Sequence, residues 1–451
     1  MSAMWSVCAL LVVLASASAS PRVAAPMPPL HNLLDSFASW EAALENGVDV
    51  QEKLLDSGTP VLPPIDNTRH YFGTAAVVTE HGYPVEEYKV NTTDGYVITI
   101  FRIPPSQACL QPNKTVRAVF IMHGLLSSST DWCAPPANRA IPYLLSNCCY
   151  DVWLGNARGT TESRDAGKYS PDDGRYWDFT WHEIGVYDVP ASIDFILNFT
   201  KQPNLHYVGH SQGSLVYFVM ASEVPGSMDK IRSAHLLAPS VYMKCIKSAA
   251  LRLGSIELTP VWRVAQLLNN RALLEILPHS LPLVLFGDTF CSYRTPITQQ
   301  ACFLLIDLIG GSNPKQRDTA RLSDYMANFP GGSALKQLAH FGQLIHASSE
   351  VFRKFDYGSV ENMKRYNATV PPEYNVSRAG TSNLTLVYGL NDFLAVQSNV
   401  DKLHRLNPSS KVVVVPDAMW NHFDFIIGLG VKENVNDDVI ARIKDFDARN
   451  P

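Results

Sequence analysis

The sequence predicts an α/β fold in which helices cover a mostly parallel β-sheet. Short apolar runs rich in β-branched residues recur along the chain, most are followed by Gly, Pro or Asn, and helical patterns such as 186–198 separate them. Runs without clean polar alternation are typical of strands buried on both faces, and alternating strands and helices indicate parallel pairing. The six expected strands are Val116–Met122, Asp151–Leu154, His206–Val208, Ala234–Leu237, Leu384–Tyr388 and Lys411–Val415.

Composition supports a globular protein. Of the 451 residues 46% are apolar and only 18% are charged, which excludes disordered, collagenous and coiled-coil chains. The net charge is 37 minus 42, or -5, without a long basic run, so we expect no nucleic-acid partner. This length allows one large domain with insertions or two ordinary domains.

The first residues have the pattern of a secretory signal. Residues 5–15 are almost wholly apolar, and small Ala and Ser residues follow up to Ser20. The apolar stretch is too short to span a membrane, and Pro278, His279 and Pro282 interrupt the next candidate, residues 277–286. We therefore expect a signal peptide at 1–19, no transmembrane segment, and a protein of the secretory pathway that is extracellular or lysosomal.

Glycosylation sequons and cysteines agree with this route. Once Cys8 is removed with the signal, seven cysteines remain, so at least one is unpaired or pairs with another chain. Cys291 and Cys302 lie in one short stretch and are the expected bridge, whereas the alternative is that all seven are small buried residues. The Asn-x-Ser/Thr sequons are at Asn91, Asn113, Asn198, Asn367, Asn375 and Asn383.

The spacing of the elements predicts the domain organisation. Residues 20–74 have Pro-rich pieces and indicate an N-terminal extension or propeptide, and order is expected from near Thr79. Turn residues at 91–95 then predict a β-hairpin. About 140 residues of mostly helical pattern separate the fourth and fifth strands, far more than an ordinary connection. We expect a core formed by 75–240 and 381–451, interrupted by an inserted helical domain at 241–380.

A Gly-x-Ser-x-Gly pattern at residues 209–213 carries the first chemical signal. It follows an expected strand and opens an expected helix at 214–223, the context of a sharp elbow that presents a nucleophilic serine, here Ser211. Small residues beside the serine have a steric reason in such a turn. The alternative is a Gly-rich turn with an ordinary serine.

A serine nucleophile needs a base, and the base needs a carboxylate that fixes its tautomer. In this type of fold the order is Ser, Asp or Glu, then His. Asp392 comes just after the fifth strand and His422 follows the sixth, so both lie where parallel sheets place their sites. Asp401 and His404 are expected on a solvated helix surface, and Asp424 lies too close to His422 in sequence. His210 flanks the serine but is expected to point elsewhere and to have a packing role.

Two backbone N–H groups should stabilise the oxyanion. The residue after the nucleophile, Gln212, supplies one, and the loop after the first parallel strand supplies the other. We assign the second to Leu125, with Gly124 as the alternative, and expect His123 to brace this loop.

No metal site or cofactor is predicted: His340 and His346 do not share a helix face, and neither zinc motifs nor a nucleotide loop occur.

Taken together, these residues resemble the acid lipase family of the α/β-hydrolase fold, which includes lysosomal acid lipase, gastric lipase and insect relatives. The likeness runs from about Val78 to Lys444. It rests on motifs at 81–84, 94–96, 102–104, 123–125, 151–159, 177–183, 209–213, 355–358 and 421–424.

The resemblance implies hydrolysis of neutral lipid esters by Ser211, Asp392 and His422, with Leu125 and Gln212 as oxyanion donors. It also implies that the insertion is a helical cap and lid, and that Cys291 pairs with Cys302. The chain departs from the family at Cys148 and Cys149, at 395–397, and at Phe423, where Leu is commoner.

The expected function is therefore a serine-dependent carboxylic ester hydrolase that acts on triacylglycerols, sterol esters or both at a lipid–water interface through an acyl-enzyme. Two alternatives are a lipase-fold lipid carrier with little turnover and an esterase of small soluble esters. Candidate lipid-facing residues, of which internal packing could explain half, are Leu267, Leu268, Leu281, Val284, Leu285 and Phe286.

Overall fold

The computed structural model describes residues 73–106, 109, 116–380 and 383–451. The expected signal at 1–19, the extension up to residue 72 and the sequon at Asn113 lie outside these ranges. The helix α4 (Thr74–Glu80) already precedes the first strand, so regular structure is present before Thr79, near which it was expected to start.

An eight-stranded sheet forms the centre of the described chain, in the order β1-β2-β4-β3-β5-β6-β9-β10. The hairpin β1–β2 and the β2–β4 pair are antiparallel, and all other neighbours are parallel, which confirms the mostly parallel sheet. The strands are β1 (Glu86–Asn91), β2 (Val97–Ile103), β3 (Ala118–Met122), β4 (Asp151–Leu154), β5 (Leu205–His210), β6 (Ile231–Leu237), β9 (Leu384–Tyr388) and β10 (Lys411–Val414).

One expected strand differs in its environment. The run at 411–415 does form β10, but this strand is not buried on both faces: Val412 and Val414 are exposed. β10 is the last strand in the sheet order, and among the described residues it pairs with β9 alone and has no neighbour on its outer side. The apolar content of a strand therefore did not distinguish a central position from an edge.

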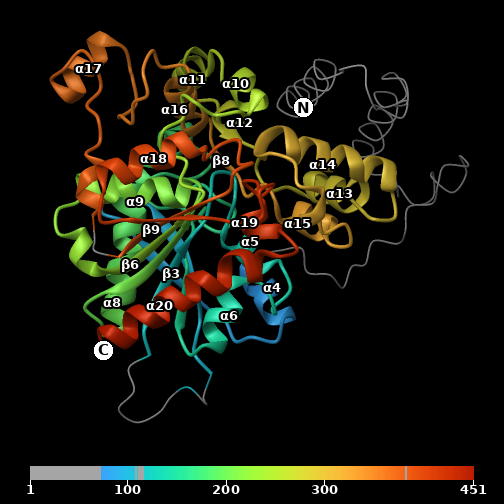
Figure 1. The fold of residues 1–451 in the computed structure, drawn as a ribbon. Coiled ribbons are helices and arrows are strands. Elements are labelled where there is room, and N and C mark those ends of the chain that lie inside the picture. The colour runs from blue at the N-terminus through green and yellow to red at the C-terminus, as the bar shows by residue number, and fades with distance from the viewer. Residues whose placement is uncertain (1–72, 107–108, 110–115, 381–382) are drawn as a thin grey trace, which may run out of the picture. The chain divides into compact units, whose positions relative to one another are not determined.

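Helices cover both faces of the sheet and form two hydrophobic cores (Figure 1). Alternate residues of β3 separate the cores, since Phe120 faces α8 and α9 while Val119 and Ile121 face the opposite layer. The first layer contains α8 (Val189–Thr200), α9 (Gln212–Glu223) and α18 (Gln397–Leu406), and the second contains α4, α5 (Ser129–Cys133), α6 (Ile141–Asn147), α19 (Asp424–Ile427) and α20 (Asp437–Arg449).

The segment between β6 and β9, called the insertion below, is mostly helical. Figure 1 shows α10, α11, α12 and α16 gathered beyond one end of the sheet. A two-stranded ribbon, β7 (Glu275–Ile276) with β8 (Ser333–Ala334), is its only sheet within the described residues. The helices are α10 (Ala249–Gly254), α11 (Leu258–Leu267), α12 (Arg271–Leu274), α13 (Leu281–Phe290), α14 (Pro296–Gly310), α15 (Leu322–Asn328), α16 (Leu335–Ile345) and α17 (Ser359–Tyr366).

Two disulfides are present. Cys291 pairs with Cys302 and ties the end of α13 to α14, which is the pairing that the resemblance implied. Cys109 pairs with Cys149, a bridge that the sequence reading did not propose. This second bridge gives a structural reason for one member of the unusual Cys148-Cys149 pair.

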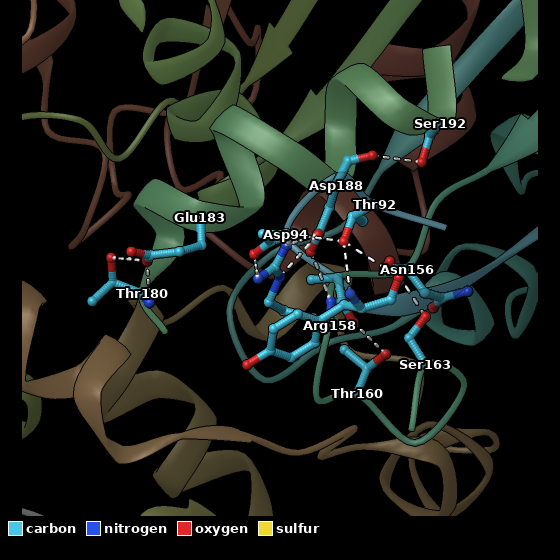
Figure 2. A network of polar contacts seen from close by, with 12 residues as sticks. Thr92, Asp94, Asn156, Arg158, Thr160, Ser163, Thr180, Glu183, Asp188 and Ser192 are labelled. Atoms are coloured by element: carbon cyan, nitrogen blue, oxygen red, sulfur yellow. Dashed lines mark hydrogen bonds and ion pairs between the residues drawn. The ribbon is translucent and has the colours of Figure 1, made fainter. Parts of the chain in front are cut away.

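A buried arginine joins the hairpin to the helical layer. Arg158, only 1% exposed, lies between two carboxylates in Figure 2, with Nη1 at 2.5 Å from Asp94 Oδ2 and Nη2 at 2.6 Å from Asp188 Oδ1. Its guanidinium also stacks 3.9 Å from the centre of the Tyr96 ring. Burial raises the pKa of Asp188, and the Arg158 charge opposes that shift. One cation thus fixes the β1–β2 turn against the start of α8.

Replacement of Arg158 by Met should lower the free energy of unfolding by about 3–5 kcal/mol, because Asp188 would remain buried without a counterion. Urea denaturation of the purified protein measures this loss. Arg175→Met is the control, since Arg175 pairs with Asp173 at the surface and its loss should leave the urea midpoint nearly unchanged. Equal midpoints for Arg158→Met and wild type would contradict the structural role.

Candidate active site

The turn between β5 and α9 presents Ser211 at the carboxyl end of the parallel strands. Ser211 has φ 54° and ψ -115°, a conformation that favours glycine and is strained for serine. Its N–H donates to the carbonyl of Leu237 at the end of β6. The flanking glycines are needed for close approach, since a Cβ on Gly209 would lie 2.7 Å from the Gly213 backbone and one on Gly213 would lie 2.3 Å from Met122 O.

The three residues assigned as nucleophile, base and acid meet in one hydrogen-bonded chain. Ser211 Oγ lies 2.8 Å from His422 Nε2, and His422 Nδ1 lies 2.9 Å from Asp392 Oδ2. If Nδ1 carries the proton, Nε2 is free to accept the serine proton. The arrangement therefore provides a hydroxyl with a positioned general base, as nucleophilic catalysis requires.

Backbone donors fix the carboxylate. Asp392 is fully buried, and its Oδ1 accepts hydrogen bonds from the N–H groups of Leu394 (2.7 Å) and Ala395 (2.8 Å). Both contacts are made by backbone atoms. Of residues 395–397, where the chain departs from the family, only the N–H of Ala395 takes part. The departure therefore leaves the support of Asp392 intact.

His210 holds the backbone of the assigned base, His422. Its Nε2 donates to the His422 carbonyl at 3.0 Å, and the two rings are centred 4.9 Å apart. Burial holds the pKa of His210 well below its usual range, so the ring is neutral. The sequence predicted only a packing role for His210 and missed this hydrogen bond, because the contact joins residues 212 positions apart.

The loop after β3 lies directly against the nucleophile. A Cβ on Gly124 would come 3.2 Å from Ser211 Cβ. His123 Nδ1 lies 2.7 Å from Gly124 O and His123 Nε2 accepts from the Ala157 N–H, so His123 braces this loop as expected. Among the described residues, neither Leu125 N–H nor Gln212 N–H donates to another group, so both are available to a ligand.

Three other histidines that the sequence singled out form hydrogen bonds with serine side chains or with the backbone. His404 bonds Ser410, His346 bonds Ser255, and His340 bonds the Arg353 carbonyl while it stacks on Trp181. Within the described ranges no three metal-ligating side chains come together.

Asp424 does not contact the base ring, but it holds the loop that carries His422. Its Oδ2 accepts from the Asn421 N–H (3.0 Å) and from Asn313 Nδ2 (2.9 Å) of the insertion. The Asn421 side chain in turn accepts from the N–H groups of Phe423 and Asp424. Sequence reasoning set Asp424 aside as acid and had no signal for its partner 111 residues away.

The assigned triad is covered. Ser211 is 8% exposed, and His422 and Asp392 are less exposed still. Near the site the insertion contacts the loop after β3, where the Gly331 N–H donates to Leu126 O.

The insertion has an apolar outer face, and the described members of the candidate lipid-facing set divide into exposed and buried residues. Leu267 is 86% exposed and Leu268 is also exposed at the end of α11, where Val261 and Val264 extend the same apolar surface. Val284, in contrast, is 2% exposed and packs inside the insertion, so its assignment was wrong. The side chains of Leu281, Leu285 and Phe286 lie outside the described part of the structure.

Most sequons lie where a glycan could be attached. Asn91, Asn198, Asn367 and Asn375 are exposed, and Asn383 is half-buried. None of the helices in the described ranges is long and apolar enough to cross a membrane.

Comparison with protein families and relatives agrees with this geometry. Residues 74–135 match the partial alpha/beta-hydrolase lipase region, and residues 117–429 match the alpha/beta hydrolase fold. Lipase 3 of Drosophila melanogaster is 38% identical over 372 residues, which cover 82% of this chain and 92% of the relative. Gastric triacylglycerol lipase of Rattus norvegicus is 33% identical, with 82% and 91% covered.

Two further similarities extend the comparison. The lysosomal acid lipase/cholesteryl ester hydrolase of Macaca fascicularis is 31% identical, with 84% of this chain and 92% of the relative covered. A solved structure of a putative lipase from Sulfolobus solfataricus has a TM-score of 0.51 at 15% identity and covers 80% of this chain and 94% of that one. The structural likeness concerns the fold alone.

Asp424 should make the protein less stable as the pH rises from about 4 to about 7. Burial raises its pKa from 3.8 to about 7, with Asp417 and Asp307 acting in the same direction, against the Asn421 N–H and the Asn313 amide. In this window the folded state binds a proton that the unfolded state has lost, so stability falls as pH increases. Asp424→Asn keeps an acceptor oxygen and removes the titration.

We expect the wild-type Tm to fall relative to that of Asp424→Asn between pH 4 and pH 7, as measured by calorimetry in buffers of matched ionic strength. Parallel Tm profiles for the two proteins would show that Asp424 is ionised throughout.

Proposed function

The chain belongs to the acid lipase family of the α/β-hydrolase fold, and we propose that it is a serine-dependent lipase that hydrolyses the esters of neutral lipids. The observation that carries this proposal is the unbroken chain from Ser211 Oγ through His422 to Asp392. The relatives support the substrate class, because their names specify triacylglycerol and cholesteryl ester.

The first half of the reaction is acyl transfer to Ser211. His422 Nε2 takes the hydroxyl proton while Oγ attacks the ester carbonyl, and Asp392 stabilises the resulting imidazolium. The N–H groups of Leu125 and Gln212 donate to the oxyanion of the tetrahedral intermediate. When this intermediate collapses, His422 gives the proton to the departing alcohol, which leaves an acyl-serine.

Water completes the cycle. His422 removes a proton from water, the hydroxide attacks the acyl carbonyl, and the fatty acid leaves as the proton returns to Ser211 Oγ.

The surroundings of the site favour a lipid over a small soluble ester. The assigned triad is buried, so the insertion acts as a cap that must open, and its outer surface carries exposed apolar side chains at Leu267 and Leu268. Contact of these side chains with a lipid surface would bury them at the moment when substrate is near. The sequons and the expected signal support a secretory route to the extracellular space or the lysosome.

A Ser211→Ala protein should lose activity on emulsified triacylglycerol by a factor of about 10⁴–10⁶, because the acyl-enzyme cannot form. Fatty-acid release followed by pH-stat titration measures this loss. The matched control is Ser222→Ala, a buried serine at the far end of α9 whose Oγ contacts Glu223 and the Asn375 N–H, and it should retain activity within a factor of about two. Activity that survives in Ser211→Ala would refute the nucleophile.

The same assay separates the alternatives. A lipase should become more active as triacylglycerol passes from dissolved monomer to emulsion, whereas an esterase of small esters should not respond. A wild-type protein that binds the emulsion without releasing fatty acid would instead be a lipid carrier.

A further inference from the structure

A short segment of the insertion, residues 310–313 at the end of α14, joins the two loops that carry the assigned acid and base. The Gly310 carbonyl accepts two hydrogen bonds, each of 3.2 Å, from the N–H groups of Phe393 and His422. Phe393 directly follows Asp392. A single oxygen of the insertion therefore fixes the backbone at His422 and next to Asp392.

The two glycines of this segment pack closely against the acid loop and the base loop. A Cβ on Gly310 would lie 2.5 Å from Phe423 Cδ2 and 3.2 Å from His422 Cβ. Gly311 has φ 105°, and a Cβ there would lie 2.1 Å from Asn391 O. Both glycines are thus required for direct contact between the insertion and the catalytic loops.

The next two residues extend the junction to both loops. The Ser312 carbonyl accepts from Asn391 Nδ2 at 2.8 Å, on the acid side. On the base side, Asn313 Nδ2 donates to Asp424 Oδ2 (2.9 Å) and to Asp417 Oδ2 (3.1 Å), and the Asn313 side chain is buried. Three of these four consecutive residues, Gly310, Ser312 and Asn313, therefore bond the acid loop and the base loop together.

The segment is itself held firmly within the insertion. The Gly311 N–H donates to Asp307 O, and the Asp307 side chain accepts from Ser312 Oγ at 2.7 Å and from Arg317 Nη2 at 2.5 Å. One helix turn earlier, the Cys302–Cys291 disulfide ties α14 to α13. A shift of the segment would therefore require α14 to shift as well.

We propose that residues 310–313 are a positioning element that sets the separation and orientation of Asp392 and His422. The insertion then has two separate parts: α14 aligns the acid and the base, and only other parts of the insertion move to admit substrate. This inference rests on the proposed function, because it assigns a role in the same reaction. A displacement of about 1 Å in such a constellation costs about a hundredfold in rate.

The direct test is Gly310→Ala, assayed with a short-chain p-nitrophenyl ester below its solubility limit, so that no lipid surface is involved. The added methyl group displaces Phe423 and His422, and we expect kcat to fall at least tenfold while KM stays within a factor of two. The wild-type enzyme is assayed first: if it hydrolyses no ester, the proposed function fails, and that outcome is distinct from failure of this inference.

Gly342→Ala is the matched control for general damage to the insertion. Gly342 lies in α16, where a Cβ would come 2.7 Å from Ser255 O, a comparably close contact with no link to the assigned triad. This variant should keep wild-type kcat. The double variant Gly310→Ala/Phe423→Ala removes the ring that the new methyl group meets, and it should recover at least threefold in kcat over Gly310→Ala.

Asn313→Ala provides a second variant that adds no volume, in case Gly310→Ala does not fold. It removes the bonds to Asp424 and Asp417, and it should lower kcat about three- to tenfold with unchanged KM. The proposal is overturned if folded Gly310→Ala or Asn313→Ala keeps wild-type kcat, if the loss lies in KM alone, or if Gly342→Ala loses as much kcat as they do.

Discussion

The backbone of Ser211 lies at φ 54° and ψ -115°, a region that a residue other than glycine occupies only at a cost of about 1–3 kcal/mol. The surrounding structure fixes this conformation: β5 and α9 are buried along their lengths, and the Ser211 N–H bonds the last carbonyl of β6. The two glycines of the motif allow the elbow to approach its own helix and the end of β3. The position of the nucleophile thus depends on the parallel sheet, and the assigned base and acid are placed relative to this serine.

The acid and the base reach Ser211 from loops that follow β9 and β10, and neither loop is held by the sheet alone. The Gly310 carbonyl bonds both loops, Asn313 bonds the base loop, and His210 donates to the carbonyl of His422. The insertion therefore contributes to the geometry of the reacting groups as well as to the burial of the site. Residues 310–313 of the insertion therefore belong with the groups that position the assigned acid and base.

The sequence predicted the features that local pattern determines. Five of the six expected strands (β3, β4, β5, β6 and β9) are buried and have at least one parallel neighbour, and Asp392 and His422 could be placed because they follow strand ends. The pattern could not show that β10 is exposed, because Val412 and Val414 have the same apolar character at an edge as in the centre. Val284 was misassigned for a related reason, since a periodic apolar helix does not reveal which face packs inward.

Several other contacts between residues far apart in the chain could not be predicted from the sequence. The Cys109–Cys149 bridge, the Arg158 ion pairs and the bonds of Gly310 all join segments whose proximity follows only from the fold. The sequence analysis assigned no role to Gly310 and Gly311. Their significance is visible only against Phe423, His422 and Asn391.

The most direct test of Ser211 as the activated nucleophile is covalent labelling with a fluorophosphonate, followed by peptide mapping in a mass spectrometer. Because His422 activates one serine only, we expect one phosphonyl group per chain, attached to the peptide that contains Ser211, and a much slower reaction in His422→Ala. Labelling of a different residue, or equal rates in the wild-type and His422→Ala proteins, would contradict the account.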